Sequence, residues 1–508
     1  MKLSVAMIVA NEASMVPGFL EALDGLWDEL VVVDTGSSDG TVAAFEAAGA
    51  KLVHATWTHD FSAARNVGLA HVTGEWVLVL DADERVTPEF KAQLLAAIAR
   101  PELGALEVRF TTPLPYGHRA ESSAIRAWRR DDTIRFRHPV REEVDVGARR
   151  CELIDAPLIH LGAVRHRAAL QDQKRRDARI LRAHLATQPR DFFCWLKLLE
   201  LARAHQDETL WREAAREATD CLELAGRSVL TTEPFGGALV AIIAEGLFAP
   251  DSAAGLLYLE GWSPHLHPSS EYRLRRAFFR EHQSQHEAAR EDYEASLPDD
   301  PVAPRLGLAR LALARSDGAA ALQLGRRALE AGPRNPEALL AVASLTRQLE
   351  GRAALELWSD AHRALEPHCP ELEWAIGEAS LAAGDHKRAV GSFRRAAGVP
   401  PAGPSAVRLA QALLASGQLA ASEQLAHQLL PAQPEAGLGL LLFDLAAGRD
   451  TTLELELTEE SANAALRQWV DALVASKDRK VLRKVRELVG AVGNLFPWLP
   501  EYLLKKSA

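Results

Sequence analysis

Short apolar runs alternate with segments of helical periodicity along the first hundred residues. The apolar runs are rich in Val, Leu and Ile and lie at 3–9, 30–33, 51–54 and 76–80. Segments with apolar residues at helical spacing separate them, at 16–26, 41–48 and 62–71. Strands that alternate with helices usually pair in parallel, so this part predicts a Rossmann-like α/β fold with a parallel sheet covered on both faces.

The pattern changes from about residue 167, where Ala-, Leu- and Arg-rich helical segments replace the strands. Four glycines recur every 33 residues, and three prolines recur every 34 residues: Gly318, Gly351, Gly384 and Gly417, with Pro336, Pro370 and Pro404. This helix-turn-helix period resembles the tetratricopeptide repeat. We therefore expect an α/β domain at 1–165, a helical linker or repeat region at 166–300, tetratricopeptide-like repeats at 301–435 and a helical cap at 436–508.

Composition places the chain among ordinary globular proteins. Its 508 residues are 48% hydrophobic and 25% charged, enough apolar material for several buried cores. The four cysteines form no CxxC pair, which indicates a reducing compartment and no structural zinc. No signal-peptide cleavage pattern follows the first apolar run, and no run is long enough for a membrane span. We therefore expect a cytoplasmic protein.

Charge is unevenly distributed along the chain. The net charge is −11, but residues 118–182 carry 16 Lys and Arg against 10 Asp and Glu, a local excess of +6 (16 − 10 = 6). Such a stretch suits a phosphate or another anionic ligand, and solvated charge on helix surfaces is the alternative explanation.

Polar residues follow three of the four predicted strands. Asn11-Glu12 follows the first, the segment 34–41 the second, and Asp81-Ala82-Asp83-Glu84 the fourth. Ligands of open α/β sheets bind beyond the carboxyl ends of the strands, where these residues lie. Asp81 and Asp83 project to the same side of an extended chain, and two adjacent carboxylates favour a hard divalent cation such as Mg²⁺ or Mn²⁺.

These residues also carry a family resemblance. The ordered motifs are Val9-Ala10-Asn11-Glu12, the segments 31–41 and 60–66, and the segment 73–84 with its Asp-x-Asp. Together they resemble the family 2 glycosyltransferases, which have the GT-A fold. Looser similarity follows at 126–136 and at Ile159-His160-Leu161-Gly162, and some members of this branch are fused to tetratricopeptide repeats.

The resemblance implies roles for individual residues. Asp34 would contact the nucleotide base, Glu12 would lie near the ribose, and Arg65 would lie near the base or diphosphate. Asp81 and Asp83 would hold the sugar nucleotide and the metal, with Asp83 the more direct ligand.

His160 would complete the metal shell in this interpretation, although a packed or capping histidine is an equal alternative. The branch often has a His-Glu pair on the acceptor side, and here the corresponding place reads Arg141-Glu142. Glu142 is the predicted catalytic base, and a solvated glutamate beside Arg141 is the alternative.

The sequence thus predicts a metal-dependent, inverting glycosyltransferase that uses Mn²⁺ or Mg²⁺ and a nucleotide-sugar donor, a UDP-sugar by analogy with the family. The acceptor is expected to be a protein or peptide held by the helical repeats, with no nucleic acid and no membrane span involved. A lipopolysaccharide or other anionic glycan is the alternative acceptor. A tetratricopeptide-type interaction scaffold with a degenerate transferase domain is the alternative of another class.

Overall fold

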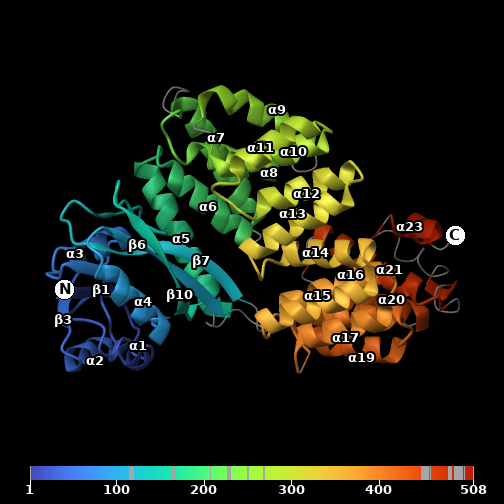
Figure 1. Ribbon diagram of the computed structural model, residues 1–508, viewed down its shortest axis with the longest axis horizontal. Helices are drawn as coiled ribbons and strands as arrows, with labels where there is room; N and C mark the ends of the chain where they lie inside the picture. Colours follow the sequence, from blue (N-terminus) through green and yellow to red (C-terminus); the bar gives the residue numbers. More distant parts are fainter. Residues whose placement is uncertain are drawn as a thin grey trace. The chain divides into compact units, whose positions relative to one another are not determined.

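The structure, a computed structural model, describes most of the chain. The described residues are 2–113, 119–162, 167–205, 207–225, 230–248, 251–266, 269–399, 401–447, 457, 459–478, 483–485, 496 and 498–506. They form two compact units, one of residues up to Gln285 and one that begins at His286 (Figure 1). The division into four regions made from the sequence stays a prediction, and parts of its C-terminal cap lie outside the described residues.

An eight-stranded mixed sheet forms the N-terminal part of the first unit. Its strands are β1 (Leu3–Val9), β2 (Glu29–Asp34), β3 (Lys51–His54), β4 (Trp76–Val79), β5 (Glu84–Arg85), β6 (Ala105–Pro113), β7 (Arg119–Arg129) and β10 (Cys151–His160). The spatial order is β3-β2-β1-β4-β7-β6-β10-β5. A separate pair, β8 (Phe136–Arg137) and β9 (Glu143–Val144), is antiparallel.

The parallel pairing expected from the sequence holds for β1 to β4 and ends there. β7 runs antiparallel to both β4 and β6, and β5 runs antiparallel to β10. The parallel sheet expected for the first hundred residues is therefore confirmed for β1 to β4, and the later strands extend it into a mixed sheet. β6 and β7 follow each other directly in the chain, and so short a connection forces antiparallel pairing.

Helices cover both faces of the sheet, as the apolar pattern predicted. They are α1 (Val16–Leu23), α2 (Thr41–Ala47), α3 (Phe61–Leu69) and α4 (Pro88–Ile98). Within β4, Leu78 belongs to one core, whereas Val77 and Val79 belong to another. Alternate side chains of a strand point to opposite faces, so the continuous apolar run of β4 fills both cores.

The parallel strands bring the predicted polar segments to one edge of the sheet. β1, β2 and β4 end there, and hydrogen bonds join the loops that follow them. The backbone N–H of Glu12 donates to Thr41 Oγ1 at 2.8 Å, and that of Ser38 donates to Asn11 Oδ1 at 2.8 Å. The loops after β1 and β2 are therefore held as one rigid rim.

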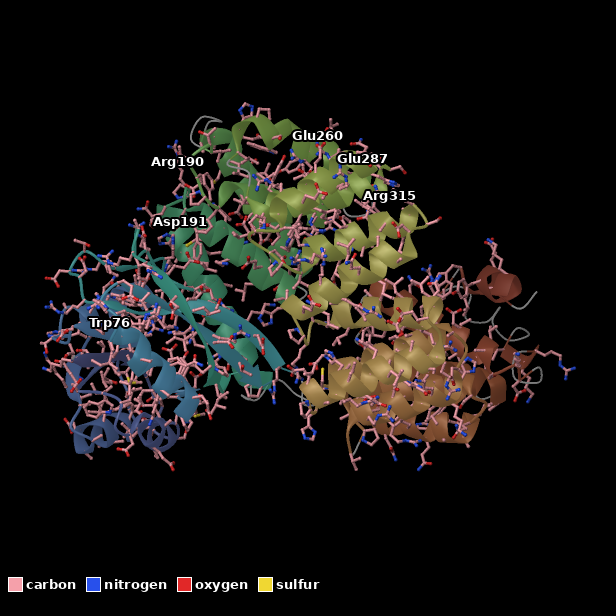
Figure 2. All side chains as sticks on the ribbon, in the orientation of Figure 1. Trp76, Arg190, Asp191, Glu260, Glu287 and Arg315 are labelled. Atoms are coloured by element: carbon pink, nitrogen blue, oxygen red, sulfur yellow. The ribbon has the colours of Figure 1, made fainter. Side chains whose placement is uncertain are left out.

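Trp76 fixes the position of β7 against β4. Trp76 lies at the start of β4 (Figure 2). Its side chain is fully buried, and the guanidinium of Arg129 lies 5.0 Å from its ring centroid. Trp76 and Arg129 are also register partners in the antiparallel β4–β7 pair. Because β7 runs the opposite way, Arg126 of β7 lies toward the carboxyl end of β4.

A group of helices completes the first unit. They are α5 (Arg167–Thr187), α6 (Phe192–Ala204), α7 (Glu208–Ala225), α8 (Gly236–Phe248), α9 (Ser252–Trp262), the 3-10 turn η3 (Ser263–His265) and α10 (Ser270–His282). Their shared core also takes in Val140, from the loop between β8 and β9. This loop is therefore packed against the helices of its own unit.

The second unit is helical throughout its described residues. Its helices are α11 (His286–Ser296), α12 (Ala303–Ala314), α13 (Gly318–Ala331), α14 (Pro336–Leu349), α15 (Arg352–Leu365), α16 (Pro370–Ala382), α17 (His386–Ala397), α18 (Gly403–Ala415), α19 (Leu419–Leu429), α20 (Glu435–Ala447), α21 (Glu459–Ala475) and α23 (Leu499–Lys506). The helix pairs expected from the glycine and proline spacing are confirmed, and the second unit is an all-α repeat region.

Three of the four periodic glycines occupy turns with positive φ. Gly351, Gly384 and Gly417 have φ of 92°, 73° and 81° between paired helices. Glycine adopts this left-handed conformation without a steric penalty. Gly318 differs, because it begins α13, and Ser316 with φ of 62° takes the equivalent turn position.

No helix in the described part of the chain is both long and apolar enough to cross a lipid bilayer.

Candidate active site

A cavity of about 990 Å³ opens at the edge of the sheet where β1 and β4 end. Its lining comes from these strand ends, from α3, β7 and the β8–β9 hairpin, and from α5. Six of the seven residues predicted from the sequence line it: Glu12, Arg65, Asp81, Asp83, Glu142 and His160. The fold thus gathers side chains that lie up to 148 positions apart in the chain (160 − 12 = 148).

Asp34 ends β2 beside the cavity rather than in its lining. Its carboxylate accepts the backbone N–H of Ser37 at 3.0 Å and that of Gly36 at 3.3 Å, and His54 Nδ1 lies 3.5 Å away. Burial raises the pKa of this carboxyl, but the hydrogen bonds from Ser37 and Gly36 outweigh it and lower the pKa. Asp34 therefore stays ionised and shapes the turn after β2.

Arg65 links two carboxylates across the cavity. Its Nη2 lies 2.8 Å from Asp81 Oδ1, and its Nε donates to Glu142 Oε1 at 2.6 Å. The side chain is only 7% exposed, and its guanidinium also lies 5.5 Å from the Phe136 ring centroid. Burial lowers the pKa of Arg65, but Asp81 and Glu142 raise it above its ordinary value, so the cation is permanent.

One guanidinium nitrogen of Arg65 stays available within the described structure. Nη1 is buried, and no described residue offers it a hydrogen-bond acceptor. A buried donor without a partner is costly, so a cavity that leaves one suits a ligand with an anionic oxygen.

A second arginine, Arg126 of β7, connects the acidic residues that follow β4. Its Nη2 lies 2.9 Å from Glu84 Oε1 and 3.6 Å from Asp81 Oδ2. Burial opposes ionisation of Asp81, but Arg65 and Arg126 lower its pKa to about 2. Burial, opposed by Arg126 but reinforced by Asp81 and Asp83, raises the pKa of Glu84 to about 7.

Asp83 and His160 approach each other at the end of β10. His160 Nε2 lies 3.7 Å from Asp83 Oδ2, and the backbone N–H of Leu161 donates to the Asp83 carbonyl at 2.9 Å. β5 and β10 pair antiparallel with Glu84 opposite His160, which fixes this approach.

Gly162 keeps this pair open. A Cβ at residue 162 would lie 2.8 Å from His160 Nε2 and 2.9 Å from Asp83 Oδ2. A carboxylate and an imidazole beside a cradle that only glycine leaves free form a donor set suited to Mn²⁺, which accepts oxygen and nitrogen ligands. The residues present therefore fit the divalent cation that the sequence implies.

The sequence analysis missed part of the lining. Arg126 and Glu84 were quoted only as members of motifs, and Gln173, Arg176 and Asp177 of α5 were not considered. The helical spacing of 173, 176 and 177 puts these three residues on one face of α5, but nothing in the sequence shows that this face turns to the sheet.

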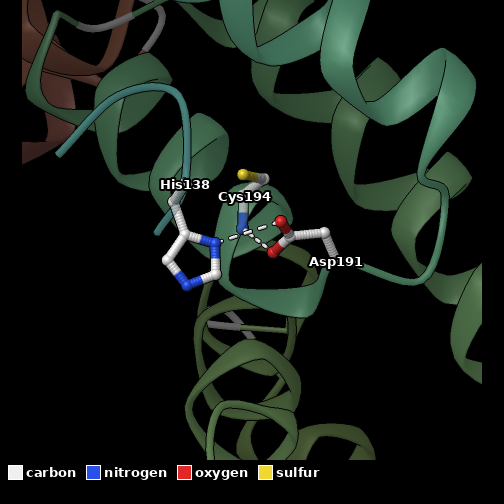
Figure 3. A group of neighbouring side chains, drawn as sticks. All are labelled: His138, Asp191 and Cys194. Carbon is white, nitrogen blue, oxygen red and sulfur yellow. Dashed lines mark hydrogen bonds and ion pairs between the residues drawn. The ribbon is translucent and has the colours of Figure 1, made fainter. Parts of the chain in front are cut away.

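A second polar group lies outside the cavity lining. Asp191, the N-cap of α6, accepts the Cys194 backbone N–H at 3.0 Å and contacts His138 Nδ1 at 3.1 Å (Figure 3). It also contacts His184 Nε2 at 2.8 Å. Burial raises the pKa of Asp191, but these partners lower it far below its usual range, whereas burial raises the pKa of the Cys194 thiol. His138, Asp191 and Cys194 have metal-ligand chemistry, but the carboxylate already has hydrogen-bond donors.

This group anchors the hairpin that carries Glu142. His138 has a positive φ of 70°, and its ring stacks on Phe193 of α6 with centroids 4.0 Å apart. A non-glycine residue in that conformation needs support from its surroundings, which Asp191 and Phe193 supply.

Comparison with known proteins identifies the class to which this sheet and cavity belong. Residues 4–151 match the family described as Glycosyl transferase family 2. The N-terminal part of the chain is thus a family 2 glycosyltransferase domain, and a helical repeat region follows it.

Two curated relatives each match part of the chain. A TPR repeat-containing protein of Synechococcus elongatus is 37% identical over 207 residues, which cover 39% of this chain and 51% of that protein. An uncharacterized glycosyltransferase of Rickettsia conorii is 32% identical over 93 residues, 18% of this chain and 33% of that protein. The chain spans about half the length of the first relative and a third of the second.

Among solved structures, glucosyl-3-phosphoglycerate synthase from Mycobacterium tuberculosis, in complex with Mn²⁺, UDP-glucose and phosphoglyceric acid, is 26% identical. The match covers 21% of this chain and 42% of that chain, with a TM-score of 0.19.

Proposed function

We propose that this protein is a metal-dependent, inverting glycosyltransferase that moves a sugar from a UDP-sugar to a protein or peptide. The main support for this proposal is the set of side chains that line the cavity. It gathers Glu12, Arg65, Asp81, Asp83 and His160 at the carboxyl edge of the sheet, in a domain that matches the glycosyltransferase family. Inversion and the uridine nucleotide are expectations from that family.

The donor side follows from the charges around the strand ends. Asp34 is assigned to the nucleotide base and Glu12 to the ribose. Arg65 has a buried, unpartnered Nη1, which suits a diphosphate oxygen.

Asp81, Asp83 and His160 would hold the sugar nucleotide and a divalent cation, Mn²⁺ or Mg²⁺. When bound, that cation supplies a positive charge beside the leaving diphosphate. Arg65 and Arg126 add fixed positive charge on the same side, since both lie against Asp81.

Transfer joins the acceptor to the anomeric carbon on the face opposite the diphosphate. The acceptor nucleophile gives up a proton as the new bond forms, and the diphosphate leaves with the electrons of the broken bond. A carboxylate on the acceptor side must take this proton. Glu142 is the residue predicted for this from the sequence, and it lines the cavity.

A protein acceptor is favoured by the helical repeats, because arrays of this kind form surfaces that commonly hold peptides. An anionic glycan is the second candidate. Arg126, Arg141 and Arg176 all line the cavity and would suit its charge. A scaffold with a degenerate transferase domain is the remaining alternative, and the complete set of donor-side charges argues against it.

Measurement of UDP release from a panel of UDP-sugars tests the proposal. We expect the purified chain to hydrolyse at least one of UDP-glucose, UDP-N-acetylglucosamine and UDP-galactose slowly with Mn²⁺, and to stop when EDTA is added. Calorimetry should show binding of the same donor only with the cation. A chain that neither binds nor hydrolyses any donor would favour the scaffold.

A further inference from the structure

One face of α5 forms a wall of the candidate active site. Gln173, Arg176 and Asp177 line the cavity, although α5 begins at Arg167, beyond the family match that ends at residue 151. The guanidinium of Arg176 lies 5.0 Å from the ring centroid of Phe61, which lines the cavity from α3. This contact fixes the helix against the sheet domain within the same unit.

Asp177 is the buried carboxylate of this wall. Its side chain is 7% exposed, and its Oδ1 accepts from Arg176 Nε at 2.9 Å and lies 2.8 Å from Arg176 Nη2. The charges of Arg141 and Glu142, from the β8–β9 hairpin, also act on it. Asp177 therefore lies on the acceptor side, close to the position that the family resemblance assigns to the base.

Glu142 already forms an ion pair with the buried Arg65. It and Asp81 are the two anions that compensate the buried guanidinium of Arg65. Proton transfer to Glu142 would leave this buried guanidinium, only 7% exposed, with a single anionic partner, which is strongly unfavourable. Arg176, the partner of Asp177, is 40% exposed, so water compensates it when Asp177 becomes neutral.

We infer that Asp177, rather than Glu142, accepts the proton of the acceptor nucleophile, and that Glu142 is a positioning residue that holds Arg65. The inference rests on the proposed transfer reaction. In the step, the nucleophile's O–H or N–H bond breaks and its proton passes to Asp177. The nucleophile's electron pair forms the bond to the anomeric carbon, and the sugar–phosphate bond breaks with its electrons on the diphosphate.

The environment of Asp177 agrees with this role. Burial raises its pKa above the ordinary value, against the opposing effects of Arg176 and Arg141, while the negative charge of Glu142 raises it further. His205 also lies within electrostatic reach. A carboxylate of raised pKa is a stronger base. The rate should fall as the pH is lowered through this pKa.

Hydrolysis of a UDP-sugar by the full chain with Mn²⁺ tests the inference, because water then replaces the acceptor and must lose its proton in the same way. Asp177→Asn should lower UDP release by about 10²-fold or more, with UDP affinity by calorimetry within about threefold of wild type. Asp172→Asn, an exposed carboxylate of the same helix, is the matched control and should leave both unchanged.

Two further variants keep the test independent of whether Asp177→Asn folds. Glu142→Gln should retain the loss of rate at acidic pH that the wild type shows. Arg176→Gln should shift that loss to higher pH, because it removes a cation that lowers the pKa of Asp177.

The inference is overturned if Asp177→Asn releases UDP at the wild-type rate. It is also overturned if Glu142→Gln abolishes the loss of rate at acidic pH while Arg176→Gln leaves that loss at the same pH as in the wild type. Absence of donor binding by the wild type would instead overturn the proposed function.

Discussion

Asp83 is the residue whose removal most directly tests the metal site. Its carboxylate faces His160 Nε2 at 3.7 Å in a loop after β4. Asp83→Ala should abolish the Mn²⁺-dependent part of donor binding, because the oxygen proposed to coordinate the cation is lost, while the melting temperature stays near that of wild type. Calorimetry with UDP and Mn²⁺ measures the effect. Equal affinity in the variant would exclude Asp83 as a ligand.

Gly162 offers a test that removes no ligand. In Gly162→Ala, the added methyl would meet both His160 and Asp83 at less than 3 Å, so the pair must separate. We expect Mn²⁺ affinity to fall by about tenfold or more, equivalent to about 1.4 kcal/mol. Gly261→Ala is the control, since nothing lies within 4 Å of its added Cβ. If both variants bind Mn²⁺ like the wild type, the cation lies elsewhere.

At this scale the sequence predicted which polar residues meet at one edge of the sheet, and the roles assigned to them stay predictions. Glu12, Asp81 and Asp83 follow strands whose apolar runs are unmistakable, so their meeting at one edge follows from parallel pairing. The contact between Arg65 and Glu142 joins residues 77 positions apart. No periodicity encodes such a pair, and only the packing of α3 on the hairpin reveals it.

At the scale of elements, the paired helices of the second unit depend on close approach. Gly377 of α16 would place a Cβ 2.6 Å from the Phe393 ring of α17. Gly377→Ala should therefore destabilise the repeat by about 1–3 kcal/mol, the usual cost of overpacking.

Gly391→Ala in α17 is the matched control for this pair. Its added Cβ would meet only the end of Arg395, at 3.7 Å, so the gain in helix propensity should dominate by up to about 1 kcal/mol. Urea unfolding of both variants measures the difference. Equal destabilisation by the two substitutions would show that helix contact is not the cause.

The elements themselves were largely predictable, and their less regular parts were not. The first four strands and three helices were placed within a few residues by apolar periodicity alone. The antiparallel insertion of β7 and the positive φ of His138 were not, because each depends on partners distant in the chain. Asp191 caps α6 and meets His138 across 53 positions, which no local pattern predicts.

For the whole molecule, the division at Gln285 suggests that donor chemistry resides in the first unit. A chain that ends after Gln285 keeps every residue of the cavity lining, so it should bind UDP-sugars and hydrolyse them within about threefold of the full chain. If the repeats capture the acceptor, it should no longer transfer labelled sugar to macromolecules in an extract of cells that naturally contain the protein.

The two activities should therefore separate in this truncated chain. Full transfer by the first unit alone would give the repeats another partner. Loss of UDP binding would instead show that the second unit supports the site.

The wall that α5 contributes also has an evolutionary consequence. Glu12, Asp34 and Asp81 lie at strand ends within the family match, whereas Gln173, Arg176 and Asp177 lie on a helix beyond it. With Asp177 and Arg176 retained, substitutions at Gln173 on this helix face should alter acceptor choice while the nucleotide-sugar chemistry is preserved. Homologues that share the strand-end motifs can thus diverge in what they glycosylate, and α5 is the segment to exchange in chimeras that transplant acceptor preference.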